Sequence, residues 1–503
     1  MSENAISQNL PPPAPTRQTP WFWRLGIAVG ITLLGLAAYG LRDLIGLRGQ
    51  AAIGVFFFFG IVAVFSSNLR AVNWRTIGWG VALQVLLALF VLKIGYTRDL
   101  TDKELLALES QRAAALIGAG AMGPYNVLPV APVQTPTTTF IRPFYACFEL
   151  LGDVVKAFIG FSDKGAEFVF GNLASPGDIA LNPGVPFKFL FAFKALPPIL
   201  FVSAFFTVLY HFGILQWCVR GMARIMVYLM GTSGAETLSV SANVFMGQTE
   251  APLIVKPYVP RMTNSELFTL MVSGFAHISG GMMVVYINYG ADPVAVLTTC
   301  VMACPGSLYL AKLFLPEMTT PETSGTVHTA KEKSPFVNAI DAAASGTSDG
   351  LRLALNVAAM LIVFIAFVAM FNAILGAIWP GMSLETLFGK VFAPAAFLMG
   401  VDMADIEKVG TLLGTKLALN EHVAYLTLKE WTLKPAFMSE RSYKLTAFAL
   451  TGFANFSSVG IQLGGIGALA PDRRHDLARL GGRALFVGFT ATLLNAAIAG
   501  VLM

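Results

Sequence analysis

The strongest constraint on this chain is a series of long apolar stretches separated by polar segments. A helix needs about 20 apolar residues to cross a hydrocarbon core of about 30 Å. Roughly nine stretches approach that length, at residues 21–41, 51–67, 77–95, 189–210, 265–290, 293–315, 351–379, 443–470 and 482–503. Only 13% of the 503 residues are charged, too few to cover a soluble protein of this size. The sequence therefore predicts an all-α polytopic membrane protein.

Charge and cysteine usage exclude other classes. The net charge is +5 and no long basic run occurs, so nucleic-acid binding has little support. Cys300 and Cys304 are one helical turn apart and resemble half of a metal site. No pair of histidines close in sequence completes such a site, so these thiols are interpreted as buried and inert.

The polar segments divide the chain. Residues 1–20 are rich in proline and predict a disordered tail, which leaves residues 21–95 as N-terminal spans. The stretch 21–41 is interpreted as an uncleaved span, with a signal peptide as the alternative. Residues 96–187 predict an interfacial helix and an exposed loop. Residues 317–348 form the longest polar loop and separate two halves.

Orientation rests on the basic residues beside the first spans. Most of them favour a cytoplasmic N-terminus in a plasma (inner) membrane, namely Arg17, Arg24, Arg70 and Arg75. Arg42 and Arg48 favour the opposite orientation.

The two halves contain a weak internal repeat. Residues 274–281 read GFAHISGG and residues 452–459 read GFANFSSV. Each follows an interrupted apolar region that carries a carboxylate, Glu250 in the first half and Glu421 in the second. Interrupted segments at matching positions are typical of transporters with inverted repeats, because irregular backbone at membrane depth lines a watery cavity.

This repeat predicts two re-entrant helical hairpins and two broken transmembrane helices. The first repeat is expected at 188–316 with its hairpin near 222–260. The second is expected at 349–503 with its hairpin near 385–428. Chance similarity between two helices rich in small residues is the alternative.

Glu250 and Glu421 are the main candidates for a binding site. A carboxylate in a membrane helix costs about 2.5–3.5 kcal/mol on insertion scales, so it is retained where it faces a cavity and binds something. The alternative is that each pairs with a nearby lysine, Lys256 or Lys416.

The polar residues around the two carboxylates favour a neutral ligand that is rich in hydroxyl groups. Carboxylates accept hydrogen bonds from ribose hydroxyls, an amide pairs with the edge of a base, and Phe453 offers an apolar face to a ring. The amides and hydroxyls in question belong to Gln248, Thr249, Asn420, Asn455 and Ser458. A site with two carboxylates and little positive charge disfavours phosphorylated substrates.

Three segments resemble the signatures of the concentrative nucleoside transporter family. They read MGQTEAP at 246–252, GTKLALNEHVAY at 414–425 and GFANFSS at 452–458. The resemblance runs from about residue 48 to the C-terminus. It implies a homotrimer in which each protomer carries its own nucleoside site.

The resemblance also implies roles for individual residues. The nucleobase would face Gln248, Thr249 and Glu250. The ribose would be held by Glu421, Asn455 and Ser458, beside Phe453. Met282 stands where the family has a small apolar residue near the base, and its bulk is expected to alter base preference.

Two histidines depart from the family pattern at or beside the residues implied for the coupling cation and the substrate. The implied sodium site comprises Asn243, Met246 through its carbonyl, His277 and Ile278. His277 replaces a serine or threonine, and His422 replaces a phenylalanine. Because an imidazole nitrogen suits a proton better than Na⁺, proton coupling is favoured. Sodium coupling through backbone carbonyls, or loss of tight coupling, stays open.

The sequence thus predicts a cation-coupled nucleoside symporter that works by alternating access and has no cofactor beyond the coupling H⁺ or Na⁺. Its partners would be nucleosides, lipid and two further copies of itself. A symporter for another polar solute, such as an amino acid, is the main alternative. A channel and a membrane-embedded enzyme using Asp402/Asp405 or Asp472/Asp476 are weaker ones.

Overall fold

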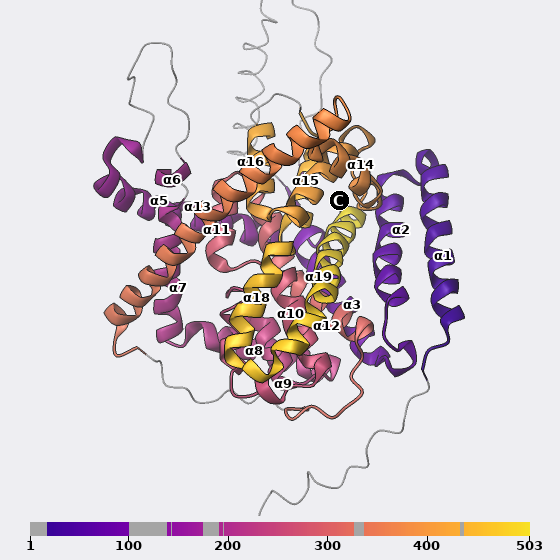
Figure 1. Ribbon diagram of the computed structural model, residues 1–503, viewed down its shortest axis with the longest axis horizontal. Helices are drawn as coiled ribbons and strands as arrows, with labels where there is room; N and C mark the ends of the chain where they lie inside the picture. The colour runs from indigo at the N-terminus through magenta and orange to yellow at the C-terminus, as the bar shows by residue number, and fades with distance from the viewer. Residues whose placement is uncertain are drawn as a thin grey trace, which may run out of the picture.

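In the residues that the computed structural model describes, the regular structure is helical apart from one small ribbon (Figure 1). It describes residues 18–99, 138–141, 143–174, 191–194, 196–325, 336–432 and 437–503. Most of the predicted tail, residues 100–137 and 175–187 of the segment 96–187, and residues 326–335 of the polar loop 317–348 lie outside the described residues.

The N-terminal spans are α1 (Trp21–Gly40), α2 (Arg42–Val64) and α3 (Trp74–Leu92). Within α1 only Ala38 is buried, and its main neighbour is α2. An apolar helix that exposes almost every side chain requires lipid around it. In Figure 1, α1 and α2 stand at one side of the molecule.

The ribbon is a departure from the all-α prediction. Strand β1 (Tyr96–Asp99) pairs antiparallel with β2 (Thr138–Ile141). The β-branched residues of β2 favour an extended backbone over a helix. The ribbon leads into α5 (Pro143–Phe170), a 28-residue helix.

The first half contains a hairpin and a broken helix. Its helices are α6 (Phe191–Lys194), α7 (Pro197–His211), α8 (Ile214–Met230), α9 (Gly234–Ala242), α10 (Asn264–Ala276), α11 (Gly280–Asn288) and α12 (Pro293–Phe314). Helix α9 packs against the 3₁₀ helix η5 (Ala251–Val255), and together they form the first hairpin, residues 234–255. The sequence placed this hairpin near 222–260, but residues up to Met230 belong to α8.

The second half repeats this plan. Its helices are α13 (Ala339–Ile378), α14 (Leu384–Leu398), α15 (Ile406–Ala418), α16 (Glu421–Thr432), α17 (Glu440–Leu450), α18 (Phe456–Leu469) and α19 (Arg474–Leu502). The second hairpin is α15 and α16, residues 406–432, whereas the prediction near 385–428 had included α14. The predicted polar loop 317–348 was also too long, because Asn338 caps α13 and starts it at Ala339. The other 3₁₀ helices are Leu69–Ala71, Gly171–Leu173, Val259–Arg261, Met403–Asp405 and Pro471–Arg473.

Six helices of the described residues are long and apolar enough to cross a membrane, or seven if the pair α7 and α8, bent by 73°, counts as one span. The sequence indicated roughly nine. The difference arises where an apolar stretch is not one simple helix. Residues 443–470 are split between α17 and α18, and 189–210 fall mainly in α7, which belongs to the bent pair.

The centre of the molecule is formed by α10, α12 and α19, which pack on one another and are mostly buried. The two hairpins approach this centre from opposite ends: α9 lies at the bottom of Figure 1 and α15 and α16 at the top. A buried ion pair, Lys312 Nζ to Glu236 Oε2 at 2.8 Å, ties the start of α9 to the end of α12. The arrangement directs both hairpin tips toward the middle of the bundle.

Candidate functional site

Two interrupted helices meet in the middle of the structure. The first break, residues 277–279, separates α10 from α11, and the second break, residues 451–455, separates α17 from α18. The Phe453 amide donates to the His277 carbonyl at 3.0 Å, so the breaks touch. Gly452 has φ +138°, and a methyl group there would lie 2.7 Å from Thr492 Cγ2. Only glycine combines that dihedral with such a close approach.

A chain of hydrogen bonds joins the tips of the two hairpins across the second break. Gln248 Nε2 donates to Ser458 Oγ at 3.2 Å. The Ser458 amide donates to Asn455 Oδ1 at 2.8 Å, and Asn455 Nδ2 donates to Glu421 Oε2 at 2.8 Å. All four residues are buried. Four residues that the sequence had grouped, separated by up to 210 positions, therefore form one polar cluster.

Two residues of α18, an amide and a glycine, allow the first hairpin to pack against α10 and α18. Gln462 Nε2 donates to Gln248 Oε1 and to the Met271 carbonyl, each at 3.1 Å. A methyl group at Gly465 would lie 2.6 Å from Thr249 Cγ2. Thr249 thus packs closely on α18 and is half-buried. Gln462 was not recognised from the sequence, although it is a polar residue one turn after Ser458 on the same helix.

The two carboxylates differ in their surroundings. Glu250 is exposed, and its Oε2 accepts a hydrogen bond from the Gly247 amide at 3.1 Å. Glu421 is 5% exposed. Within the described chain neither forms an ion pair. Lys416 Nζ instead donates to the Ala449 carbonyl at 2.8 Å and to a threonine hydroxyl at 3.0 Å. In the described chain, neither glutamate thus forms a direct ion pair with the lysine named in the alternative, Lys256 or Lys416.

Helix α11 contributes two tyrosines that sequence reasoning missed. Tyr286 Oη donates to Glu421 Oε1 at 2.8 Å, and Tyr289 Oη lies 2.8 Å from His422 Nε2. Their spacing of three residues places them on one face of α11, but nothing local in the sequence shows that this face meets the second hairpin. Met282, on the same helix, is buried in an apolar cluster, and Phe453 packs beside that cluster.

A second polar group lies between the first hairpin and the first break. Asn243 Nδ2 donates to Ser273 Oγ at 2.9 Å, and His277 Nδ1 lies 2.9 Å from the Ser273 carbonyl. A carbonyl accepts only, so Nδ1 carries the hydrogen and Nε2 is an acceptor. His277 Nε2 and Asn243 Oδ1 are both buried acceptors with no hydrogen-bond partner in the described structure. Unpaired buried acceptors of this kind fit a small cation or a proton.

The other two residues predicted for this group lie alongside it. Ile278 is fully buried, and Met246 is half-buried and packs against the core. The adjoining Phe245 carbonyl accepts from the Gly280 amide at 2.9 Å, so the first hairpin is bonded to the start of α11.

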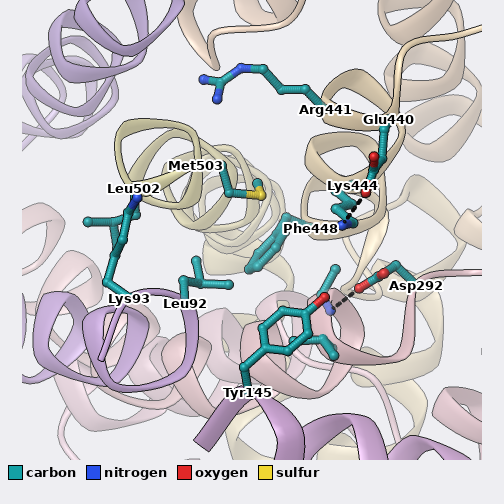
Figure 2. A pocket seen from close by; sticks show the side chains of 12 residues that line it. Leu92, Lys93, Tyr145, Asp292, Glu440, Arg441, Lys444, Phe448, Leu502 and Met503 are labelled. Carbon is teal, nitrogen blue, oxygen red and sulfur yellow. Dashed lines mark hydrogen bonds and ion pairs between the residues drawn. The ribbon is translucent and has the colours of Figure 1, made fainter. Parts of the chain in front are cut away.

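A cavity of about 290 Å³ lies apart from this cluster, between the ends of α3, α12, α17 and α19 (Figure 2). Its charged side chains already have partners. Glu440 pairs with Lys444 at 2.6 Å, Asp292 caps α12 through the Ala295 amide, and Arg441 donates to backbone carbonyls. We therefore do not place the substrate there.

One member of each acidic pair weighed for an enzyme already has a basic partner. Asp405 accepts from Lys408 at 2.9 Å, and Asp476 pairs with Arg473 at 2.8 Å. In the described part of the chain, no three His, Cys, Asp or Glu residues come together as a metal site.

Three family models match the chain. They are described as the Na⁺-dependent nucleoside transporter C-terminus, at residues 295–500, nucleoside recognition, at 192–292, and the Na⁺-dependent nucleoside transporter N-terminus, at 53–119. Human sodium/nucleoside cotransporter 1 is 33% identical over 98% of this chain and 70% of its own length. The chain belongs to the concentrative nucleoside transporter family.

Other relatives agree with this family assignment. Rat solute carrier family 28 member 3 is 32% identical over 99% of this chain, and the match spans 65% of the rat protein. An uncharacterized transporter of Haemophilus influenzae is 41% identical over 69% of this chain and 84% of its own. The chain thus spans about two thirds of the mammalian proteins and most of the bacterial one.

Solved structures of a nucleoside transporter homologue share the fold. CNTnw in an inward-facing, substrate-bound state is 32% identical, with a TM-score of 0.75, over 91% of this chain and 98% of that chain. A variant of CNTnw in an outward-facing state has a TM-score of 0.75 at 31% identity. This member of the nucleoside transporter family is therefore a multi-pass helical membrane protein.

Proposed function

We propose that this protein is a cation-coupled nucleoside symporter that works by alternating access. The observation that carries the proposal is the hydrogen-bond chain from Gln248 to Glu421, because it joins both hairpin tips at the touching helix breaks. A ligand bound along this chain contacts both halves of the fold at once. That is the arrangement a transporter needs if substrate is to stabilise the closed, mobile state.

The residues divide into a base side and a ribose side. Gln248, Thr249 and Glu250, on the first hairpin, would face the nucleobase. Glu421, Asn455 and Ser458 would bind the ribose, since a carboxylate and an amide oxygen accept from hydroxyl groups. Phe453 and Met282 would border the bound nucleoside as its apolar walls.

The rival substrate class, amino acids, lacks support at this site. Recognition of a substrate carboxylate generally uses a cationic side chain. The buried ammonium nearest in sequence, Lys416, is already bonded to a carbonyl and a hydroxyl. The polar atoms of the cluster suit hydroxyl and base groups instead.

The same proposal covers assembly and orientation. We infer re-entrant hairpins related by an inverted repeat, a homotrimer with one site per protomer, and insertion in the plasma (inner) membrane with a cytoplasmic N-terminus. In each protomer the bound nucleoside would cross with a transport domain that contains both hairpins. The helices that precede the first hairpin would form the stationary scaffold.

For the coupling ion we propose H⁺. Na⁺ is the alternative that the uptake experiment below distinguishes. The acceptor presented by residue 277 is an imidazole nitrogen, His277 Nε2, where relatives are expected to offer a hydroxyl oxygen. Asn243 Oδ1 is the acceptor that suits Na⁺. Movement of one charge through 100 mV contributes about 2.3 kcal/mol, enough for roughly fiftyfold accumulation.

Uptake of labelled uridine and adenosine into proteoliposomes tests the function. We expect saturable accumulation that unlabelled nucleosides inhibit and that amino acids, nucleobases and nucleotides do not. Imposing pH and Na⁺ gradients separately identifies the ion: inward H⁺ is expected to drive uptake at zero Na⁺. Uptake that follows Na⁺ at fixed pH would overturn proton coupling and leave nucleoside transport standing.

A further inference from the structure

Helix α11 and the second hairpin are held together by two parallel tyrosine contacts. Tyr286 of α11 and Tyr289, the C-cap residue of that helix, are 0% and 2% exposed. Tyr286 Oη bonds Glu421 and Tyr289 Oη bonds His422, each at 2.8 Å, so consecutive residues at the start of α16 meet tyrosines one turn apart. The register between α11 and α16 is therefore fixed at two points.

Aromatic packing surrounds these bonds. The Tyr289 and His422 rings meet edge to face at 5.2 Å between centroids, and Tyr286 stacks on Tyr425 at 4.5 Å. Rings in these arrangements resist sliding as well as separation. The contact therefore constrains the direction in which the Glu421 side chain leaves α16.

The carboxylate of Glu421 has little freedom of its own. One oxygen accepts from Tyr286 on the first half and the other from Asn455 at the second break. A ribose hydroxyl must use the lone pairs that these two donors leave. A small rotation of α16 would misalign those lone pairs without breaking the fold.

We propose that Tyr289 and His422 form a positioning pair that orients the Glu421 carboxylate toward the sugar hydroxyls of a bound nucleoside. The pair does not touch the ligand, and this inference rests on the proposed function. It assigns His422 a role in sugar recognition through its neighbour, in place of the role of coupling-proton carrier that its sequence position suggested.

The test compares uridine with 3′-deoxyuridine, which lacks one sugar hydroxyl. Wild type is expected to prefer uridine in kcat/KM. Tyr289→Phe keeps the aromatic ring, and His422→Phe replaces the imidazole with another aromatic ring. Each variant removes one partner of the hydrogen bond. We expect each to lower the preference for uridine about three- to tenfold, the size of one ordinary hydrogen bond.

The double variant Tyr289→Phe/His422→Phe separates positioning from mere loss of stability. The second change cannot break the Tyr289–His422 hydrogen bond again, so the loss of preference in the double variant should be smaller than the two single losses combined. Replacing both partners with apolar rings also restores packing without an unpaired polar group. The melting temperature of the double variant should therefore exceed that of the singles.

The matched control is Tyr309→Phe. Tyr309 is equally buried and donates to Gln84 Oε1 at 2.7 Å, between α12 and α3 and away from the second hairpin. The Tyr309→Phe substitution should lower thermal stability and leave the preference for uridine over 3′-deoxyuridine unchanged.

Two results would overturn the positioning role: an unchanged preference in both single variants, or additive losses in the double. If wild type itself binds no nucleoside, the proposed function fails. If wild type discriminates and the variants do so equally, only the positioning pair fails.

Discussion

Replacing Glu421 with glutamine tests the ribose side of the site with the smallest change in shape. The carboxylate accepts hydrogen bonds from Tyr286 and Asn455 at 2.8 Å each. An amide has one oxygen, so it must face the Asn455 amide nitrogen, and its own nitrogen must donate to Tyr286. Both contacts survive, with the tyrosine hydroxyl turned to accept.

Glu421→Gln removes the negatively charged hydrogen-bond acceptor that the carboxylate offers to the sugar. A hydrogen bond to a charged group contributes about 1.5–3 kcal/mol, so we expect uridine affinity to fall about 10- to 150-fold. Equilibrium binding to purified protein in detergent measures this, with monodispersity on size exclusion as the check on folding. Glu385→Gln, on the exposed start of α14, is the matched control and should bind normally. Binding of uridine by Glu421→Gln within twofold of wild type would remove Glu421 from the site.

Three further predictions follow from the geometry. Gly465→Ala places a methyl group 2.6 Å from Thr249 of the first hairpin and should abolish most uridine uptake. The control Gly464→Ala, with no atom within 4 Å of the new methyl group, should not. Equal uptake by both variants would refute the close packing of the first hairpin on α18. His277→Ser exchanges the imidazole for a hydroxyl and should make uridine uptake depend on Na⁺, measured at fixed pH. Uridine uptake by this variant that an H⁺ gradient alone still drives would refute His277 as the proton carrier. Burial raises the pKa of Asp405, but hydrogen bonds, led by that from the Ser439 amide, outweigh it and hold the pKa below its usual range. This contribution to stability is present above the unfolded pKa of about 4 and is lost as pH falls through the folded value. Asp405→Asn should reduce the fall in melting temperature that wild type shows as pH is lowered. An unchanged fall would refute this contribution of Asp405 to stability.

Motif and period grouped four residues of the candidate site. The sequence grouped two amides, one carboxylate and one hydroxyl from the interrupted segments alone. The structure brings these side chains together, namely those of Gln248, Asn455, Glu421 and Ser458. The reason is physical: polar residues in apolar helices are expensive, so those present concentrate where a cavity or partner satisfies them.

The parts that could not be predicted depend on long-range packing. Tyr286 and Tyr289 look like ordinary core aromatics, and only the approach of α16 to α11, over 130 residues away in sequence, gives them polar partners. The limits of the second hairpin differ from the predicted ones for a local reason. Residues 385–398 are as apolar as a hairpin arm, but Gly400 with φ +78° turns the chain before α15 begins.

The most direct test of the central claim is an experimental structure with uridine bound. We expect the base within hydrogen-bond distance of Gln248 and the ribose hydroxyls within hydrogen-bond distance of Glu421 and Asn455, between the two hairpin tips. Uridine seated elsewhere, for example in the cavity of Figure 2, with both hairpin tips out of contact, would contradict it.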